Sequence, residues 1–239
     1  MRRLILVRHA TTPGMRAACF PAGEHADPAG LAQARTLVLP ARAALFSAPE
    51  PAARQTAEAL GPVAGVLDAF ADADPGRWRG RPYAVVAQDE PDALRRWRED
   101  PEAAPHGGES VAAMARRVSR WLDEHRTTAT DPDPGIGPNP SPGPGSSLGS
   151  NPSLGPGSSP GTGTSSGPGS GTGGDGMAGT VVVCCDAGAI RAALCHALGL
   201  PPGAGPLFDL APLSVSELNV TGAGWRIGCV NRIVQKGPS

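Results

Sequence analysis

A long stretch of small and turn-forming residues divides this chain and limits how much of it can build a core. Between about residues 127 and 179, most positions are Gly, Pro, Ser, Thr or Asn. Such a stretch has too little apolar surface to offset the entropy of ordering it, so we predict a disordered insertion over 127–179. The segment after it is too short to fold alone. We therefore expect residues 1–126 and 180–239 to form a single domain.

Short apolar runs alternate with helical patterns in the rest of the chain. Apolar runs typical of buried strands occur at residues 4–7, 44–47 and 180–184, and a pair of late strands is expected at 215–220 and 225–230. Helical periodicity covers residues 28–37, 51–60, 92–98, 110–125 and 187–198. Strands that alternate with helices pair mostly in parallel, in a sheet that is covered on both faces. We predict an α/β fold, a three-layer α/β/α sandwich with a mostly parallel sheet.

Charge and cysteine usage restrict the class of partner and the compartment. The chain has 21 Lys and Arg against 22 Asp and Glu, so no global field favours nucleic acid or an anionic membrane. Its apolar N-terminal run is too short for a secretory signal, and no later segment approaches the ~20 apolar residues of a membrane span. The five cysteines have no metal-type spacing and are expected to be reduced. We expect a cytoplasmic protein without a nucleic-acid or membrane partner.

The strongest chemical signal is the sequence LVRHATT at residues 6–12. Arg8 and His9 directly follow a predicted buried strand, and ligands of open α/β sheets bind at the carboxyl ends of such strands. Cys185 and Asp186 follow another one. A guanidinium next to an imidazole can bind a phosphoryl group beside a nucleophile. His9 is therefore the candidate nucleophile, and Arg8 the candidate phosphate ligand.

Further motifs follow in a fixed order, at residues 27–34 (DPAGLAQA), 47–57 (SAPEPAARQTA), 76–80 (GRWRG), 107–110 (GGES) and 180–191 (TVVVCCDAGAIR). Together with RHATT at 8–12, they resemble the histidine phosphatase superfamily, whose fold is phosphoglycerate mutase-like. The resemblance covers the whole chain except the insertion. It implies that a neutral histidine attacks phosphorus and forms a phosphohistidine that water then hydrolyses. The resemblance implies no metal and no cofactor.

The resemblance assigns phosphate-binding positions in this chain, and not all of them hold the residue that is usual in the family. His9 matches the nucleophile, Arg8 the first arginine, and Thr12 a hydroxyl that supports the phosphate loop. The second arginine of the family corresponds to Ala52. Arg54 is the remaining phosphate-binding candidate, although two helical steps rotate it by ~200° from Ala52.

Two further catalytic positions are altered. The proton donor of the family corresponds to Asp72, one methylene shorter than the usual glutamate, with Asp74 as a second candidate. The second phosphate-binding histidine corresponds to Asp186, whose ionised carboxylate can only accept hydrogen bonds. We expect Asp186 to cap the helix that follows it. His106 and His25 could replace a lost donor, but we expect both on the surface.

These residues lead to a main hypothesis and two alternatives. The main one is a phosphomonoester hydrolase that acts on a small-molecule phosphate ester through His9, with activity reduced by Ala52 and Asp186. The first alternative is an inactive pseudo-phosphatase that binds a phosphorylated small molecule or partner. The second is a divalent metal site made by His9, Asp72 and Asp186. Neither the ester nor the oligomeric state follows from the sequence.

Overall fold

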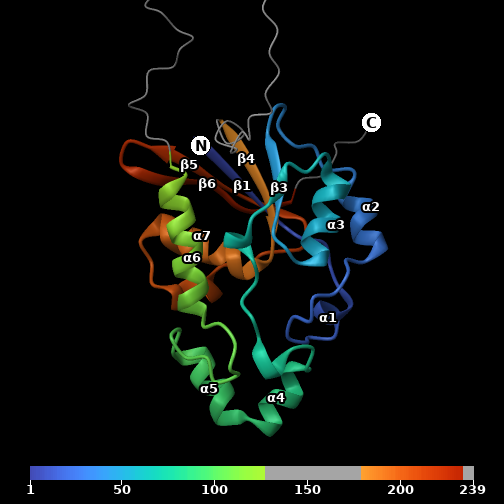
Figure 1. The fold of residues 1–239 in the computed structure, drawn as a ribbon, viewed down its shortest axis with the longest axis vertical. Coiled ribbons are helices and arrows are strands. Elements are labelled where there is room, and N and C mark those ends of the chain that lie inside the picture. The colour runs from blue at the N-terminus through green and yellow to red at the C-terminus, as the bar shows by residue number, and fades with distance from the viewer. Residues whose placement is uncertain (127–178, 234–239) are drawn as a thin grey trace, which may run out of the picture.

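The computed structural model describes residues 1–126 and 179–233, which form a mixed sheet flanked by helices (Figure 1). The sheet has six strands in the order β3-β2-β4-β1-β5-β6. The strands are β1 (Arg3–Arg8), β2 (Ala44–Ser47), β3 (Gly65–Val66), β4 (Thr180–Cys185), β5 (Ser214–Thr221) and β6 (Gly224–Ile233). Apart from Gly179, the predicted insertion at 127–179 lies outside the described residues.

The first four strands pair in parallel, and only the C-terminal hairpin is antiparallel. β4 lies between β1 and β2 and is parallel to both, β2 is parallel to β3, and β5 is antiparallel to β1 and β6. The register places Arg8 beside Cys185 at the ends of β1 and β4. The next residues, His9 and Asp186, therefore leave the sheet side by side, and the His9 N–H donates to the Cys185 carbonyl at 3.0 Å.

The two central strands are apolar on both faces, as their uninterrupted apolar sequences predict. On β1, Leu4 and Leu6 pack into one core cluster, whereas Ile5 and Val7 pack into another on the opposite face. The residues of β4 alternate between the same two clusters. Both faces must therefore be covered, and this requirement explains the helical layers.

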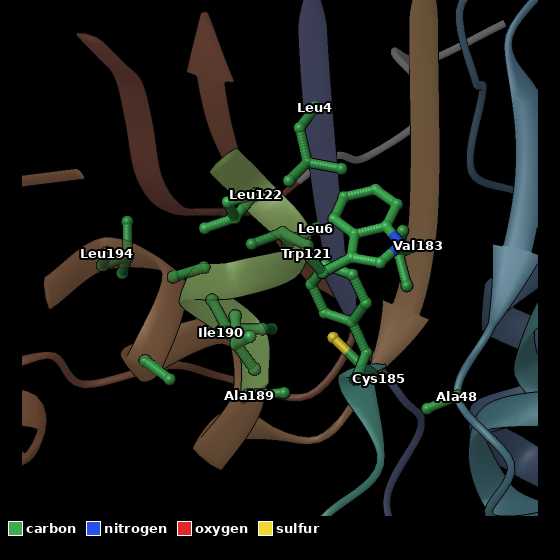
Figure 2. Close-up of a cluster of buried hydrophobic side chains, with 14 of the residues drawn as sticks. Leu4, Leu6, Ala48, Trp121, Leu122, Val183, Cys185, Ala189, Ile190 and Leu194 are labelled. Atoms are coloured by element: carbon green, nitrogen blue, oxygen red, sulfur yellow. The ribbon is translucent and has the colours of Figure 1, made fainter. Parts of the chain in front are cut away.

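Helices α6 (Val111–Glu124) and α7 (Ala187–Leu198) cover one face of the sheet. Figure 2 shows Trp121 and Leu122 of α6 and Ile190 of α7 gathered around Leu4 and Leu6 of β1. Helices α2 (Pro28–Ala34) and α3 (Pro51–Leu60) lie on the other side of the sheet (Figure 1). The predicted three-layer α/β/α arrangement with a mostly parallel sheet is confirmed.

A group of short helices lies beyond the carboxyl ends of the central strands (Figure 1). These are α1 (Pro13–Arg16), α4 (Tyr83–Asp89) and α5 (Pro91–Glu99). Phe20, Trp78, Val86 and Leu94 form a small aromatic and aliphatic core there, separate from the cores of the sheet. Of the three helices, the sequence pattern predicted only α5.

Most predicted boundaries hold to within a few residues. Helices α3 and α7 have the predicted limits, and α7 ends at Gly199 in the left-handed conformation (φ 65°). Helix α2 is shorter than predicted, because it ends at Ala34 instead of continuing to Leu37. The described residues also contain three 3₁₀ segments, Asp68–Phe70, Gly76–Trp78 and Pro202–Leu207. None of the helices in the described part of the chain has the length and apolarity needed to cross a membrane.

Candidate active site

His9 is a buried residue whose ring orientation is fixed from the backbone. Its exposed fraction is 7%, and its Nδ1 lies 2.7 Å from the carbonyl oxygen of Ala10. Because a carbonyl can only accept, Nδ1 carries a proton and Nε2 is directed away from this contact. Helix α3 holds the backbone that follows His9, since the Ala10 N–H donates to Thr56 Oγ1 at 3.0 Å.

The other ring nitrogen of His9 meets a carboxylate. His9 Nε2 lies 3.1 Å from Asp186 Oδ2, and the two side chains are only 8% and 22% exposed. Asp186 is also the N-cap of α7, because its Oδ1 accepts the Gly188 N–H at 2.8 Å. The predicted capping role of Asp186 is therefore present, and the carboxylate contacts the nucleophile candidate at the same time.

Both ring nitrogens of His9 face hydrogen-bond acceptors, which favours the doubly protonated imidazolium. Burial alone would lower the pKa of His9, but the hydrogen bond and negative charge of Asp186 outweigh burial and raise it. Burial would raise the pKa of Asp186, but the hydrogen bond from His9, the His9 charge and the Gly188 N–H lower it to about 2. Both shifts favour an ionic pair, in which the lone pair that could attack phosphorus is occupied by a proton.

Asp72 lies on the same cleft with a pKa that favours its protonated form. Burial, followed by the negative charge of Asp186, raises the pKa of this carboxyl well above its usual range. Asp72 Oδ1 accepts the Ala73 N–H at 2.8 Å, and a Cβ on Gly188 would lie 3.3 Å from this same oxygen. Asp72 is thus next to the first turn of α7, where it can act as a general acid.

Three hydrogen bonds from helix α6 hold the backbone that precedes Asp72. The Arg117 guanidinium on α6 donates to the carbonyls of Asp68, Ala69 and Ala71 at 2.9, 2.9 and 3.1 Å. Its other end pairs with Glu109 at 2.7 Å. Arg117 could not be identified from the sequence, because its role depends on carbonyl groups almost fifty residues earlier in the chain.

Arg8 lies beside the site, although it does not line the cleft. Its Nη1 donates to the carbonyl of Leu210, and its Nη2 is 4.0 Å from Met15 Sδ, which belongs to the cleft wall. Its Nε is buried and has no hydrogen-bond partner among the described residues. The guanidinium therefore retains one unused donor.

Of the remaining phosphate-binding candidates, Thr12 lies on the cleft and Arg54 does not. Thr12 lines the cleft, and its Oγ1 accepts the Met15 N–H at 3.2 Å as the N-cap of α1. Ala52, which the resemblance places at the position of a second arginine, also lines the cleft. Arg54 is exposed on α3 and is not part of the cleft lining, as its rotation from Ala52 implies. We therefore give Arg54 no phosphate-binding role.

The secondary candidates lie outside the cleft. Asp74 is 54% exposed and forms a surface ion pair with Arg79, so it is not a second acid. His25 is exposed, as expected. The expected surface position of His106 is wrong: it is 3% exposed, accepts the Gly108 N–H at 3.0 Å and packs on the Trp78 ring. His106 is a structural residue because the GGES turn encloses it.

The cleft itself has a volume of about 450 Å³, part of it open to solvent. Its acidic lining consists of Glu24, Glu50, Asp72 and Asp186, and His9 is its one basic side chain in the described part of the chain. Its apolar wall comes from Met15 of α1 and from the loop that follows, with Cys19, Phe20, Pro21, Ala22 and Gly23. Glu50 is a lining residue that the sequence analysis missed.

The acidic side chains do not form a metal centre. Within residues 1–126 and 179–233, no group of three or more His, Cys, Asp or Glu side chains has an arrangement that could hold a metal ion. The suggestion of a metal site made by His9, Asp72 and Asp186 is therefore wrong. Asp186 uses both carboxylate oxygens, one on His9 and one on the backbone of α7.

Comparison with known proteins gives one family and several similar folds. Residues 4–133 and 174–233 match the model of the histidine phosphatase superfamily (branch 1). A 58-residue stretch is 40% identical to the bifunctional protein Rv2228c of Mycobacterium tuberculosis, and it covers 24% of this chain and only 16% of that protein.

Solved structures cover almost the whole chain. The mycobacterial glucosyl-3-phosphoglycerate phosphatase in complex with inorganic phosphate has a TM-score of 0.66 and 24% identity, over 97% of this chain and 98% of that one. A putative alpha-ribazole-5'-P phosphatase from Escherichia coli K-12 has a TM-score of 0.69 and 15% identity, over 99% of both chains. At these identities the similarity establishes the fold.

Proposed function

This chain belongs to the histidine phosphatase superfamily, and on that premise we propose that it is a phosphomonoester hydrolase of reduced activity that forms a phosphohistidine at His9. The observation that carries the proposal is the orientation of His9. The Ala10 carbonyl fixes Nδ1, so that Nε2 is directed toward the cleft that also contains Asp72. A nucleophile and a protonated carboxyl on one cleft are the two groups that the reaction requires.

The proposed reaction has two steps. Neutral His9 attacks phosphorus through Nε2, the bond between phosphorus and the ester oxygen breaks, and Asp72 gives its proton to the departing alkoxide. The Asp72 carboxylate then takes a proton from water, which attacks the phosphohistidine and releases phosphate. Arg8 Nε and the hydroxyl of Thr12 are the donors proposed for the phosphoryl oxygens.

Three effects of the altered site residues lower the proposed rate. Asp186 holds His9 as imidazolium, so only the fraction of molecules in which this proton has left can attack. The family positions of an arginine and a histidine are Ala52 and Asp186, and each lost charged hydrogen bond typically costs ~1.5–3 kcal/mol. The carboxylate of Asp186 adds repulsion toward a phosphoryl oxygen.

A small-molecule phosphate ester is the proposed substrate. Two proteins of similar fold are named as phosphatases of glucosyl-3-phosphoglycerate and of alpha-ribazole-5'-phosphate, and both substrates belong to this class. All five cysteines are unpaired, which supports the cytoplasm as the proposed compartment. A cofactor has no part in the proposed steps.

A pseudo-phosphatase remains the second candidate, because one observation favours it. Apart from His9, the described lining of the cleft contains no basic side chain, whereas it contains four carboxyl groups. Such a cleft binds a phosphate dianion weakly. In this candidate, the chain binds a phosphorylated ligand through Arg8 without turnover.

Turnover of a panel of aryl and alkyl phosphates by the full chain separates the two candidates. We expect slow release of phosphate that is lost in the His9→Ala variant and accompanied by label on His9. Binding of a phosphate ester without turnover and without label would support the pseudo-phosphatase.

A further inference from the structure

Two buried polar atoms near the cleft have no hydrogen-bond partner among the described residues, and they are of opposite kind. Arg8 Nε is a donor and Glu50 Oε2 is an acceptor. Buried polar groups are nearly always paired in native proteins, so an unpaired one at a functional site indicates a group that arrives with a ligand. A phosphoryl oxygen satisfies the donor of Arg8. The acceptor of Glu50 requires a hydrogen-bond donor elsewhere on the same ligand.

The orientation of Glu50 is set by the backbone that carries Asp72. Glu50 precedes α3, but its carboxylate makes no capping hydrogen bond to that helix. Instead, its Oε1 accepts the Asp72 N–H at 2.8 Å, and its side chain lines the cleft. Glu50 is thereby fixed beside the proposed general acid, next to the position of the departing alcohol.

The charge of the cleft decides which donor suits Glu50. The lining carries four carboxyl groups and, among the described residues, neither Lys nor Arg. An ester whose alcohol part bears a carboxylate or a second phosphate would be repelled by Glu24 and Glu50, and an ammonium group would be attracted by them. The enclosed part of the cleft, about 60 Å³, and the short apolar wall around Met15 and Phe20 favour a small alcohol.

We propose that the cleft selects phosphate monoesters of small amino alcohols and that Glu50 recognises their ammonium group. This proposal rests on the proposed hydrolase function and adds a substrate class to it. The phosphoryl group lies at His9 and Arg8, and the ammonium group donates to Glu50 Oε2.

Three esters of nearly equal size test this selectivity on the full chain: O-phosphoethanolamine, ethyl phosphate and 2-phosphoglycolate. The ammonium nitrogen of the first and the carboxylate oxygens of the third lie four bonds from phosphorus, and ethyl phosphate ends one bond earlier in a neutral methyl group. We expect kcat/KM for phosphoethanolamine to exceed that for phosphoglycolate by at least tenfold, with ethyl phosphate between them, because a charged hydrogen bond is gained in one and repulsion in the other.

The Glu50→Gln variant keeps the shape of the side chain and an oxygen for the Asp72 N–H, but removes the charge. We expect the ratio between phosphoethanolamine and ethyl phosphate to fall by about tenfold in this variant. The matched control is Glu58→Gln, which removes the same charge from an exposed position of α3. It should leave the ratio unchanged. Equal use of the three esters, or an unchanged ratio in Glu50→Gln, would overturn the proposal.

Absence of hydrolysis for all three esters would refute the hydrolase function but not the selectivity. A binding measurement tests the selectivity in that case. Calorimetric titration of the His9→Ala protein with phosphoethanolamine and with phosphoglycolate measures both affinities without turnover. A Kd at least tenfold lower for phosphoethanolamine, lost when Glu50→Gln is added, supports the recognition by Glu50. Equal affinities, or no binding of either ester, contradict it.

Discussion

Asp186 links His9 to the first turn of helix α7, because Oδ2 lies 3.1 Å from His9 Nε2 while Oδ1 accepts the Gly188 N–H at 2.8 Å. One carboxylate therefore caps the helix through Oδ1 and favours a proton on the proposed nucleophile through Oδ2. A family histidine at this position would act as a donor to phosphate. Asp186 at this position instead binds the His9 ring and favours its protonated form.

Asp186→Asn should remove this preference for the protonated form without removing the cap, because Asn is an equally good N-cap residue. Without the charge of Asp186, burial dominates and the pKa of His9 falls. We expect an NMR titration of the His9 ring to show this fall, together with faster phosphate release at neutral pH. An unchanged His9 pKa would show that the Asp186 charge does not act on the ring.

Restoring both family residues should raise activity further. In the Ala52→Arg, Asp186→His double variant, two donors face the cleft in place of a methyl group and a carboxylate. Each charged hydrogen bond is worth ~1.5–3 kcal/mol, so turnover of a generic aryl phosphate should rise at least tenfold. No gain over the wild type would mean that position 52 or position 186 does not face the phosphoryl group.

The ionic pair also predicts how stability depends on pH. The folded pKa of His9 is raised above its ordinary ~6.5, so its contribution is complete below that value and is lost as the pH rises through the raised pKa. The pKa of Asp186 is lowered to about 2, so its contribution is complete above ~4 and is lost as the pH falls toward 2.

Wild type should therefore exceed Asp186→Asn in unfolding free energy by about 1.5–3 kcal/mol near pH 5.5, and by less at pH 9 and at pH 2.5. Denaturant unfolding at the three pH values measures this difference. The control is Asp123→Asn, which breaks a more exposed pair between Asp123 (56% exposed) and His196 (23% exposed). A surface pair is worth 0–1 kcal/mol, so this variant should change little. A gap between wild type and Asp186→Asn that is constant across pH would contradict the ionic pair.

Arg117 is predicted to be a positioning residue for Asp72, because it binds the three carbonyls that precede this carboxyl. Arg117→Met should lower kcat about tenfold for alkyl phosphates, whose leaving group needs a proton. Turnover of p-nitrophenyl phosphate, whose leaving group needs none, should fall much less. Arg116→Met, at an exposed position of the same helix, is the matched control. Equal losses for both ester types would indicate a general structural role for Arg117.

The fold and part of the site could be predicted from the sequence because they depend on local patterns. Uninterrupted apolar runs identified β1 and β4 as strands buried on both faces, and residues that directly follow such strands had to meet at one edge. This reasoning placed His9 and Asp186 together. The position of Asp72 came from the family motif around GRWRG, and the structure brings it onto the same cleft.

Other parts could not be predicted, because they depend on contacts between distant segments. Glu50 reaches the cleft through a hydrogen bond from the backbone of Asp72, twenty-two residues later, and nothing in its local sequence indicates this. The burial of His106 results from the turn that packs it on Trp78. The contact between Asp186 and His9 was missed for another reason: the sequence showed a capping carboxylate, but not that its second oxygen was within reach of the imidazole.

Detection of phosphate on His9 tests the central claim most directly. The full chain is incubated with a phosphate ester, kept out of acid throughout, and analysed by mass spectrometry beside the His9→Ala protein. The account predicts an acid-labile phosphate on the peptide that contains His9, stronger in Asp186→Asn than in wild type and absent from His9→Ala. Hydrolysis that continues in His9→Ala, or phosphate on another residue, would contradict it.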